Sequence, residues 1–94
     1  MSKIEKHIEH HPNGEIKEEG TYKDGDKDGL WTYWYENGMK EKMGTYKNGK
    51  LHGKWVGWSM NGQQEKEGTY KNGEKVGEWI YYKEDSFFEE IKEL

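Results

Sequence analysis

Four histidines, His7, His10, His11 and His52, are the only candidates for a metal site in this sequence, because cysteine is absent. His10 and His11 are adjacent on an expected strand, so they point to opposite faces. His7 and His11 share a face but lie four residues apart, which is about 13 Å along a strand and too far for one ion. His52 has no histidine near it in the sequence. We therefore expect no metal site.

Candidate nucleophiles are few and lack a catalytic setting. Ser2, Ser59, Ser86 and the repeated threonines occur without a G-x-S-x-G elbow, and no glycine run ends in Gly-Lys-Ser/Thr as a phosphate loop would. Carboxylate pairs such as Glu18 and Glu19 have no acid/base partner at a useful spacing. The sequence predicts a protein that is not an enzyme and has no cofactor.

A 24-residue repeat organises the chain. GLWTYWYENGMKEKMGTYKNGKLH, residues 29–52, returns over residues 53–76 as GKWVGWSMNGQQEKEGTYKNGEKV. Such periodicity indicates a repeat architecture built as one domain. We divide the chain into a degenerate first unit (5–28), two full repeats (29–52 and 53–76), a partial repeat (77–84) and a C-terminal segment (86–94).

Asn-Gly or Asp-Gly dipeptides recur between the repeated segments and are typical of two-residue type I′ hairpin turns. They predict an all-β fold, a single-layer antiparallel meander of about seven strands. The expected strands cover residues 3–12, 15–23, 26–36, 39–47, 50–60, 63–71 and 74–84.

Two-residue turns throughout would also fix the register. They place Trp31 opposite Gly44, Gly44 opposite Gly53, and Gly53 opposite Tyr70, so that large rings cover bare glycine backbone. In that register Trp31 does not lie beside its equivalent, Trp55, and the sheet should be sheared and coiled. The expected structural positions of the repeat are Trp31, Trp55, Trp79, Tyr46, Tyr70, Gly44, Gly53, Gly68 and Gly77.

The two ends depart from the repeat, as terminal units often do. His7 and His10 stand where later units carry tryptophan. After Glu84, Ser86 and Glu89 have the spacing of a capping box. With apolar residues on one helical side, this predicts a short capping helix over 86–94.

Composition and charge limit the classes of partner and the cellular location that we expect. The 94 residues carry a net charge of −4, with 15 Lys against 19 acidic residues and no strongly basic patch, which disfavours nucleic acid and anionic membranes. No apolar run is long enough for a signal peptide or a membrane span. We expect a cytoplasmic protein.

Some aromatic residues lack a glycine partner that would explain them structurally. Strand alternation places Tyr33, Tyr35 and Lys40 on the face of Trp31, and Trp34 and Trp58 on the other. Because Trp and Tyr dominate interface hot spots, the predicted protein-binding residues are Tyr33, Trp34, Tyr35 and Trp58.

The motif Gly-x-Trp-x-x-Trp/Tyr-x-x-Asn-Gly, followed by Gly-Thr-Tyr-Lys-Asp/Asn-Gly, resembles the variant MORN repeat over about residues 13–84. It is most similar to the small bacterial proteins of tandem variant repeats grouped as a toxin–antitoxin system antitoxin family. The resemblance implies an antiparallel meander used for protein contacts, with a cognate toxin as partner. A self-associating scaffold that forms a homodimer is the main alternative, and a lipid- or carbohydrate-binding module is a weaker one.

Overall fold

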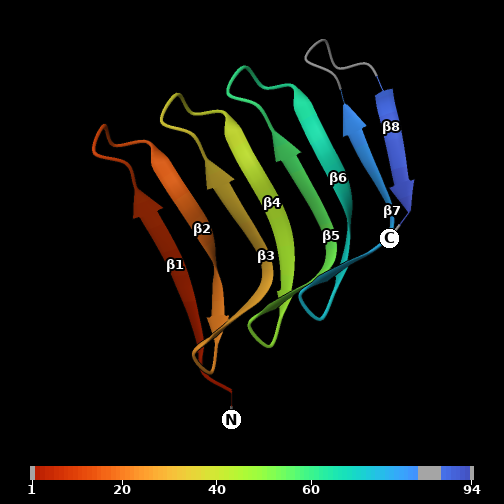
Figure 1. Cartoon of the computed structure of the whole chain (residues 1–94). Helices are drawn as coiled ribbons and strands as arrows, with labels where there is room; N and C mark the ends of the chain where they lie inside the picture. Colours follow the sequence, from red (N-terminus) through yellow and green to blue (C-terminus); the bar gives the residue numbers. More distant parts are fainter. Residues whose placement is uncertain (1, 83–87, 94) are drawn as a thin grey trace.

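The chain forms one antiparallel sheet in which every strand pairs with its neighbours in sequence (Figure 1). The computed structural model describes residues 2–82 and 88–93. Its Cα atoms extend over 45 × 35 × 11 Å, as a single layer does. The predicted meander is confirmed. Its strands are β1 (Ile4–His10), β2 (Ile16–Lys23), β3 (Asp26–Trp34), β4 (Lys40–Lys47), β5 (Lys50–Trp58), β6 (Gln64–Lys71), β7 (Glu74–Tyr82) and β8 (Phe88–Glu93).

The predicted C-terminal helix is wrong for the part of it that the structure describes. Residues 88–93 form β8, which runs antiparallel to β7 with Ile80 opposite Ile91. Residues 86, 87 and 94 of the predicted helix lie outside the described residues. Pairing with the β7 edge satisfies backbone hydrogen bonds that an added helix would leave open, which outweighs the local capping-box signal.

Two kinds of turn alternate along the meander and lie at opposite ends of the sheet (Figure 1). Asp24-Gly25, Asn48-Gly49 and Asn72-Gly73 are the tight turns that the sequence predicted, with both residues at positive φ. At Asn13-Gly14, Asn37-Gly38 and Asn61-Gly62 only the glycine has positive φ. These three are wider loops, closed for example by a hydrogen bond from Tyr35 N to Met39 O of 2.8 Å.

Across the wide loop between β3 and β4, the central residues of the two strands nevertheless pair in the predicted register. Trp34 pairs with Lys40 but Tyr33 pairs with Lys42, so one extra residue of β4 forms a bulge that restores Trp31 to Gly44. Because of this bulge, the predicted faces of two residues, Lys40 and Tyr35, are wrong. Lys40 reaches the Trp58 ring, 5.9 Å from its centroid, and Tyr35 lines a hollow with Trp34, so neither lies on the face of Trp31.

The register across the tight turns differs from the prediction. Gly44 lies opposite Trp55, not Gly53, because residues 52–54 of β5 stand opposite Thr45 alone. The same two-residue slip occurs after the other two tight turns. Gly53 lies inside this bulge with φ 114°, a conformation that side chains other than glycine rarely adopt. The slip cancels the expected shear, so Trp31 and Trp55 fall in one row.

This row crosses the sheet and alternates large rings with bare glycine. It runs through His7, Gly20, Trp31, Gly44, Trp55, Gly68 and Trp79. The side of the sheet that carries these residues is called the packed face. A Cβ built on Gly20 would lie 2.1 Å from the Trp31 ring, so only glycine admits the indole there.

Trp31 and Trp79 are the fully buried tryptophans of the described residues, both 0% exposed. Their indole nitrogens also reach backbone: Trp31 Nε1 donates to Thr21 O at 3.0 Å and Trp79 Nε1 to Thr69 O at 3.2 Å. Each ring is therefore held by contact with glycine and by a hydrogen bond that satisfies its one polar atom.

The middle repeat packs its tryptophan differently. Position 57 is glycine where Tyr33 and Tyr81 stand in the other units, and the Trp55 ring lies against it, 2.8 Å from a built Cβ. Leu51 stands where Lys27 stands one unit earlier. The side chain of Leu51 approaches Gly44 beside the indole: a Cβ built there would lie 2.9 Å from Leu51 and 2.8 Å from the Trp55 ring.

The other side, called the open face, carries a second complete row. It consists of Ile8, Glu19, Thr32, Met43, Val56, Glu67, Ile80 and Ile91. Thr32 and Val56 are buried in its centre, at 8% and 5% exposure. At the ends of the row Ile8 and Ile91 are about half exposed, at 49% and 50%.

Replacing a packed-face tryptophan should cost more stability than replacing one on the open face. We expect Trp31→Ala to lower the free energy of unfolding by about 3 kcal/mol, because a fully buried ring is lost. Trp34→Ala should cost less, since that ring is only half-buried. Urea midpoints of the two variants measure this, and a larger loss for Trp34→Ala would contradict the assignment of faces.

The glycine row predicts a steric effect distinct from backbone strain. Gly20→Ala should lower the free energy of unfolding by about 1–3 kcal/mol, since the new methyl overlaps the Trp31 ring. Gly14→Ala is the control: its Cβ would meet nothing within 4 Å, and only the positive φ of 91° opposes it. If near-ultraviolet circular dichroism of Gly20→Ala keeps the wild-type tryptophan signal, the ring does not depend on this glycine.

Candidate protein-binding surface

The structure divides the four predicted contact residues between three locations. Tyr33 lies on the packed face, where Lys27 Nζ donates to its hydroxyl at 2.8 Å. Tyr35 lies at the start of a wide loop, and its hydroxyl donates to Trp58 O at 2.6 Å. Trp34 and Trp58 are half-buried on the open face. Tyr33 and Tyr35 therefore have structural partners, and the two tryptophans keep exposed surface.

The wide loops are tied to one another by a repeated set of hydrogen bonds. Asn13 Nδ2 donates to Glu36 O at 2.9 Å, and Asn37 Nδ2 donates to Met60 O at 2.7 Å. His11 Nε2 donates to Trp34 O at 2.8 Å, in the position that the Tyr35 hydroxyl takes one repeat later. These contacts fix the loops beside each other at one end of the sheet.

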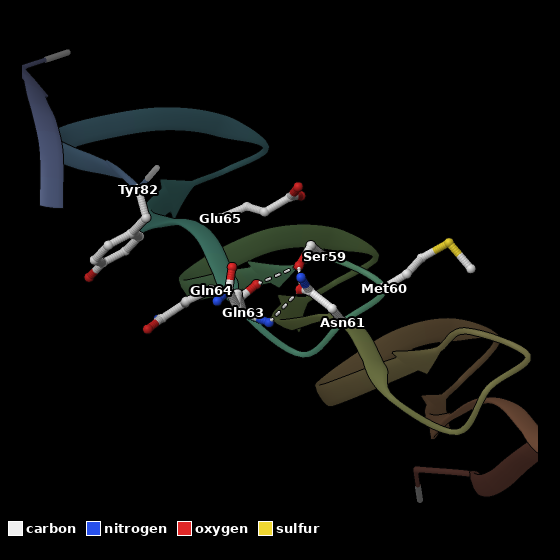
Figure 2. A pocket seen from close by; sticks show the side chains of 7 residues that line it. All are labelled: Ser59, Met60, Asn61, Gln63, Gln64, Glu65 and Tyr82. Carbon is white, nitrogen blue, oxygen red and sulfur yellow. Dashed lines mark hydrogen bonds between the residues drawn. The ribbon is translucent and has the colours of Figure 1, made fainter. Parts of the chain in front are cut away.

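Two hollows lie where successive wide loops meet the open face. The first, of about 560 Å³, is lined by His11, Trp34, Tyr35, Glu36, Asn37, Glu41 and Met60. The second, of about 430 Å³, is lined by Ser59, Met60, Asn61, Gln63, Gln64, Glu65 and Tyr82 (Figure 2). Glu41 and Glu65 occupy equivalent repeat positions, as do Asn37 and Asn61. Each hollow thus combines a carboxylate with an aromatic ring, from Trp34 and Tyr35 in the first and from Tyr82 in the second.

Hydrogen bonds inside the second hollow hold its polar side chains in place. The Ser59 hydroxyl donates to Asn61 Oδ1 and lies 3.3 Å from Gln63 O, and Gln63 N donates to Asn61 Oδ1 at 3.2 Å (Figure 2). Gln63 Oε1 is buried and has no hydrogen-bond partner among the described residues. This atom is an acceptor that a donor group could use.

Carboxylates dominate the electrostatics around the open-face aromatic rings. Burial, and then the charges of Glu41 and Glu65, raise the pKa of Tyr35. A hydrogen bond to Glu67, and then burial, raise the pKa of Tyr82, whose hydroxyl donates to Glu67 Oε1 at 2.6 Å. A carboxylate is among the causes of both shifts, so negative charge lies near each of these two hydroxyls.

Lysines cover the aromatic rings of the packed face. Lys27 Nζ lies 4.6 Å from the Trp31 ring centroid, and Lys75 Nζ lies 4.6 Å from that of Trp79. Further lysines lie over Tyr33 and Trp55, at 5.0 and 5.5 Å. Their hydrocarbon stems shield the rings while the ammonium groups reach water. The packed face is closed by its own side chains.

Tyr33 and Tyr46 both lie beneath Lys27, whose Nζ is 5.4 Å from the Tyr33 ring centroid and 5.1 Å from that of Tyr46. Burial, followed by hydrogen bonding with Tyr33 and its charge, raises the pKa of Tyr46 to about 12. Burial is also the largest cause of the raised pKa of Tyr33. Both hydroxyls therefore stay neutral at ordinary pH and serve packing.

Part of the chain matches a known repeat family. Residues 6–24 and 27–48 match the family described as the MORN repeat variant. The match supports a MORN repeat protein. MORN repeats are in general modules that bind proteins or membranes. No curated protein and no solved structure matches this chain significantly. Among the described residues, no helix is long and apolar enough to cross a membrane.

The sequence reasoning missed one group of side chains on the packed face. His7, Glu9 and Glu18 place their ligand atoms within 4.8 Å of one another. The spacing of histidines along one strand gives no sign of carboxylates on the neighbouring strand. The predicted Asn13-Gly14 hairpin already placed Glu9 opposite Glu18, so the signal was available in the register.

The Tyr46 hydroxyl predicts a loss of stability at alkaline pH. Its pKa is about 12 in the folded chain and about 10 when unfolded, so its contribution is complete below pH 10 and is lost as pH rises toward 12. Tyr46→Phe should make the free energy of unfolding fall less steeply over this range. Urea unfolding at about pH 8 and about pH 11 measures it. Equal slopes in both proteins would mean that Tyr46 ionises freely.

Proposed function

We propose that this chain is a non-enzymatic protein-binding module whose open face covers a basic, amphipathic partner. The observation that carries the proposal is the inequality of the two faces. Trp31 and Trp79 on the packed face are fully buried beneath lysines, whereas Trp34 and Trp58 on the open face keep part of their surface exposed. Exposed large apolar side chains gather on the open face and its loops: Ile4, Ile8, Leu30, Met39, Met60 and Ile91.

The charge of the open face favours a basic partner. Glu41 and Glu65 flank the two hollows, and Lys40 is the cation that lies over the Trp58 ring. A Lys or Arg side chain of a partner would meet a carboxylate and an aromatic ring together. It would also bring donors to Gln63 Oε1, which is a buried acceptor.

Occlusion is the mode of action that suits such a surface. A small rigid sheet that covers an apolar and basic patch of its partner prevents that patch from meeting anything else, and no reaction is needed. The resemblance of the repeats to those of small bacterial antitoxins makes a cognate toxin, encoded nearby and neutralised in the cytoplasm, the first partner to test.

Self-association is the second candidate, and the outer edge of β1 favours it. Strand β1 pairs only with β2, and Ile4 and Ile8 on it are 67% and 49% exposed. An open strand edge beside exposed apolar side chains can add a second copy of the same strand. The two candidates use different surfaces, so variants can separate them.

Co-expression with each neighbouring gene tests the proposal. We expect rescue from one toxic neighbour, lost in the double variant Trp34→Ser, Trp58→Ser, because the apolar centre of the contact is removed. Binding of the purified pair should weaken at least tenfold with Glu65→Lys and little with Lys66→Glu, since Glu65 lines the second hollow whereas Lys66 lies over the Trp55 ring of the packed face.

Three outcomes would count against the proposal. The first is the absence of rescue by any neighbour, and the second is a stronger effect of Lys66→Glu than of Glu65→Lys. The third is a stable dimer that Ile8→Lys disrupts in a protein with no other partner, which would favour the second candidate. Circular dichroism of each variant establishes that it is folded.

A further inference from the structure

A mixed nitrogen and oxygen cluster lies at the start of the packed face. Glu9 of β1 and Glu18 of β2 are directly opposite each other in the register. His7, two residues before Glu9, points to the same side, and its Nε2 lies 3.5 Å from Glu18 Oε1. One ligand atom from each residue lies within 4.8 Å of the other two.

Packing fixes the imidazole while leaving its outer nitrogen without a hydrogen bond. The His7 ring stacks on Trp31 at 5.4 Å between centroids and meets the edge of Tyr22 at 5.6 Å. Its Nε2 is buried and has no hydrogen-bond partner among the described residues. A buried ring nitrogen in that state is costly unless something occupies it.

Two carboxylates face each other beside this nitrogen, and like charges directly opposite on a sheet are destabilising. Burial alone raises the pKa of Glu18, but the neighbouring Glu9 and His7 side chains, together with the charges of His7 and Lys27, lower it overall. Lys17 Nζ is 3.9 Å from Glu9 Oε2. Glu18 is thus anionic at neutral pH, and Lys17 and Lys27 are the cations beside the two carboxylates.

The cluster arises where the first unit departs from the repeat. One repeat later, the equivalent positions hold Trp31, Tyr33 and Lys42. The first unit therefore has histidine at the Trp31 position and glutamate at the Tyr33 and Lys42 positions. These three differences lie at separate places in the sequence but meet at one point of the sheet. Random polar drift in an exposed terminal unit gives no reason for this convergence.

We propose that His7 Nε2 and one carboxylate oxygen each from Glu9 and Glu18 bind a divalent cation of the zinc class. Ligands about 2.1 Å from a tetrahedral ion are about 3.4 Å apart, close to the 3.5 Å between His7 Nε2 and Glu18 Oε1. Glu9 is exposed, so its side chain can turn to close the wider gap, and water completes the tetrahedron. The nitrogen ligand disfavours Mg²⁺ and Ca²⁺, which prefer oxygen.

Such an ion would tie β1 to β2 through side chains, beside the stacked rings of His7 and Trp31. It would neutralise the two facing carboxylates at the end of the sheet where the repeat has no tryptophan of its own. The site is separate from the open face, so binding of a protein partner and binding of the cation can be tested independently.

Titration of the full-length chain without a histidine tag, using zinc chloride in a calorimeter, tests the proposal. We expect one ion per chain and a Kd at least tenfold weaker in both Glu9→Gln and Glu18→Gln. Glu19→Gln is the matched control, because it makes the same change on β2 but points to the open face, and it should bind as wild type does. Magnesium chloride should give no comparable binding.

Histidine resonances in NMR spectra give a second readout that does not depend on a variant. Zinc should shift the ring signals of His7 and leave those of His52 in place, since His52 lies away from the cluster near Asn72. No binding of zinc, equal affinity in Glu9→Gln and wild type, or a shift centred on His10 and His11 would overturn the assignment. Glu9 is exposed, so its replacement should not unfold the chain, and an unchanged urea midpoint verifies this.

Discussion

Contact between a tryptophan ring and the bare backbone of a neighbouring strand is the interaction on which this structure depends. A single-layer sheet has no second layer to bury its side chains, so large apolar area must be removed from water within the face itself. Trp31 achieves this over Gly20 and Trp79 achieves it over Gly68, in both cases with no exposed area left. A methyl group at either glycine would occupy the space of the indole.

The turns serve this contact by adjusting the register. After each tight turn, three residues of the outgoing strand stand opposite one residue of the incoming strand, which brings the tryptophans of successive units into one row. After the wide loop at residues 35–39, a one-residue bulge restores the pairing of Trp31 with Gly44. The bulges therefore belong to the repeat and keep its rings aligned across the sheet.

Because the rings align on one side of the sheet, the two faces differ in how much aromatic surface they leave exposed. The proposed function depends on that difference. Lysine side chains close over the packed face, where Lys27 and Lys75 take the same place in two units. The open face keeps half-exposed tryptophans beside carboxylates of the wide loops, as a surface for a basic partner does. Where the first unit lacks its tryptophan, His7 takes the ring position and brings chemistry that the other units do not have.

The sequence by itself determined the repeat, the meander, the strand positions and three of the six turns, because Asn-Gly and Asp-Gly signals and ring positions are local. It also placed Trp31 opposite Gly44 correctly. It failed where the pairing of neighbouring strands departed from the register that two-residue turns would give. Pairing with β7 made a strand of residues 88–93 despite a helical pattern, and the bulges at Gly29, Gly53 and Gly77 shifted the register at glycines that we had expected to lie in regular strands.

Among the candidate site residues, Trp34 and Trp58 were placed on the face that the structure gives them, whereas Tyr35 and Lys40 were placed on the wrong one. A one-residue bulge changes which way the following side chains point, and it is formed by two strands together. The hydrogen bonds of Tyr33 and Tyr35, and the meeting of His7 with Glu9 and Glu18, likewise join residues of different strands. Composition and spacing decided which residues each strand offers, and only the tertiary structure decided which of them meet, because cross-strand contacts are set by register.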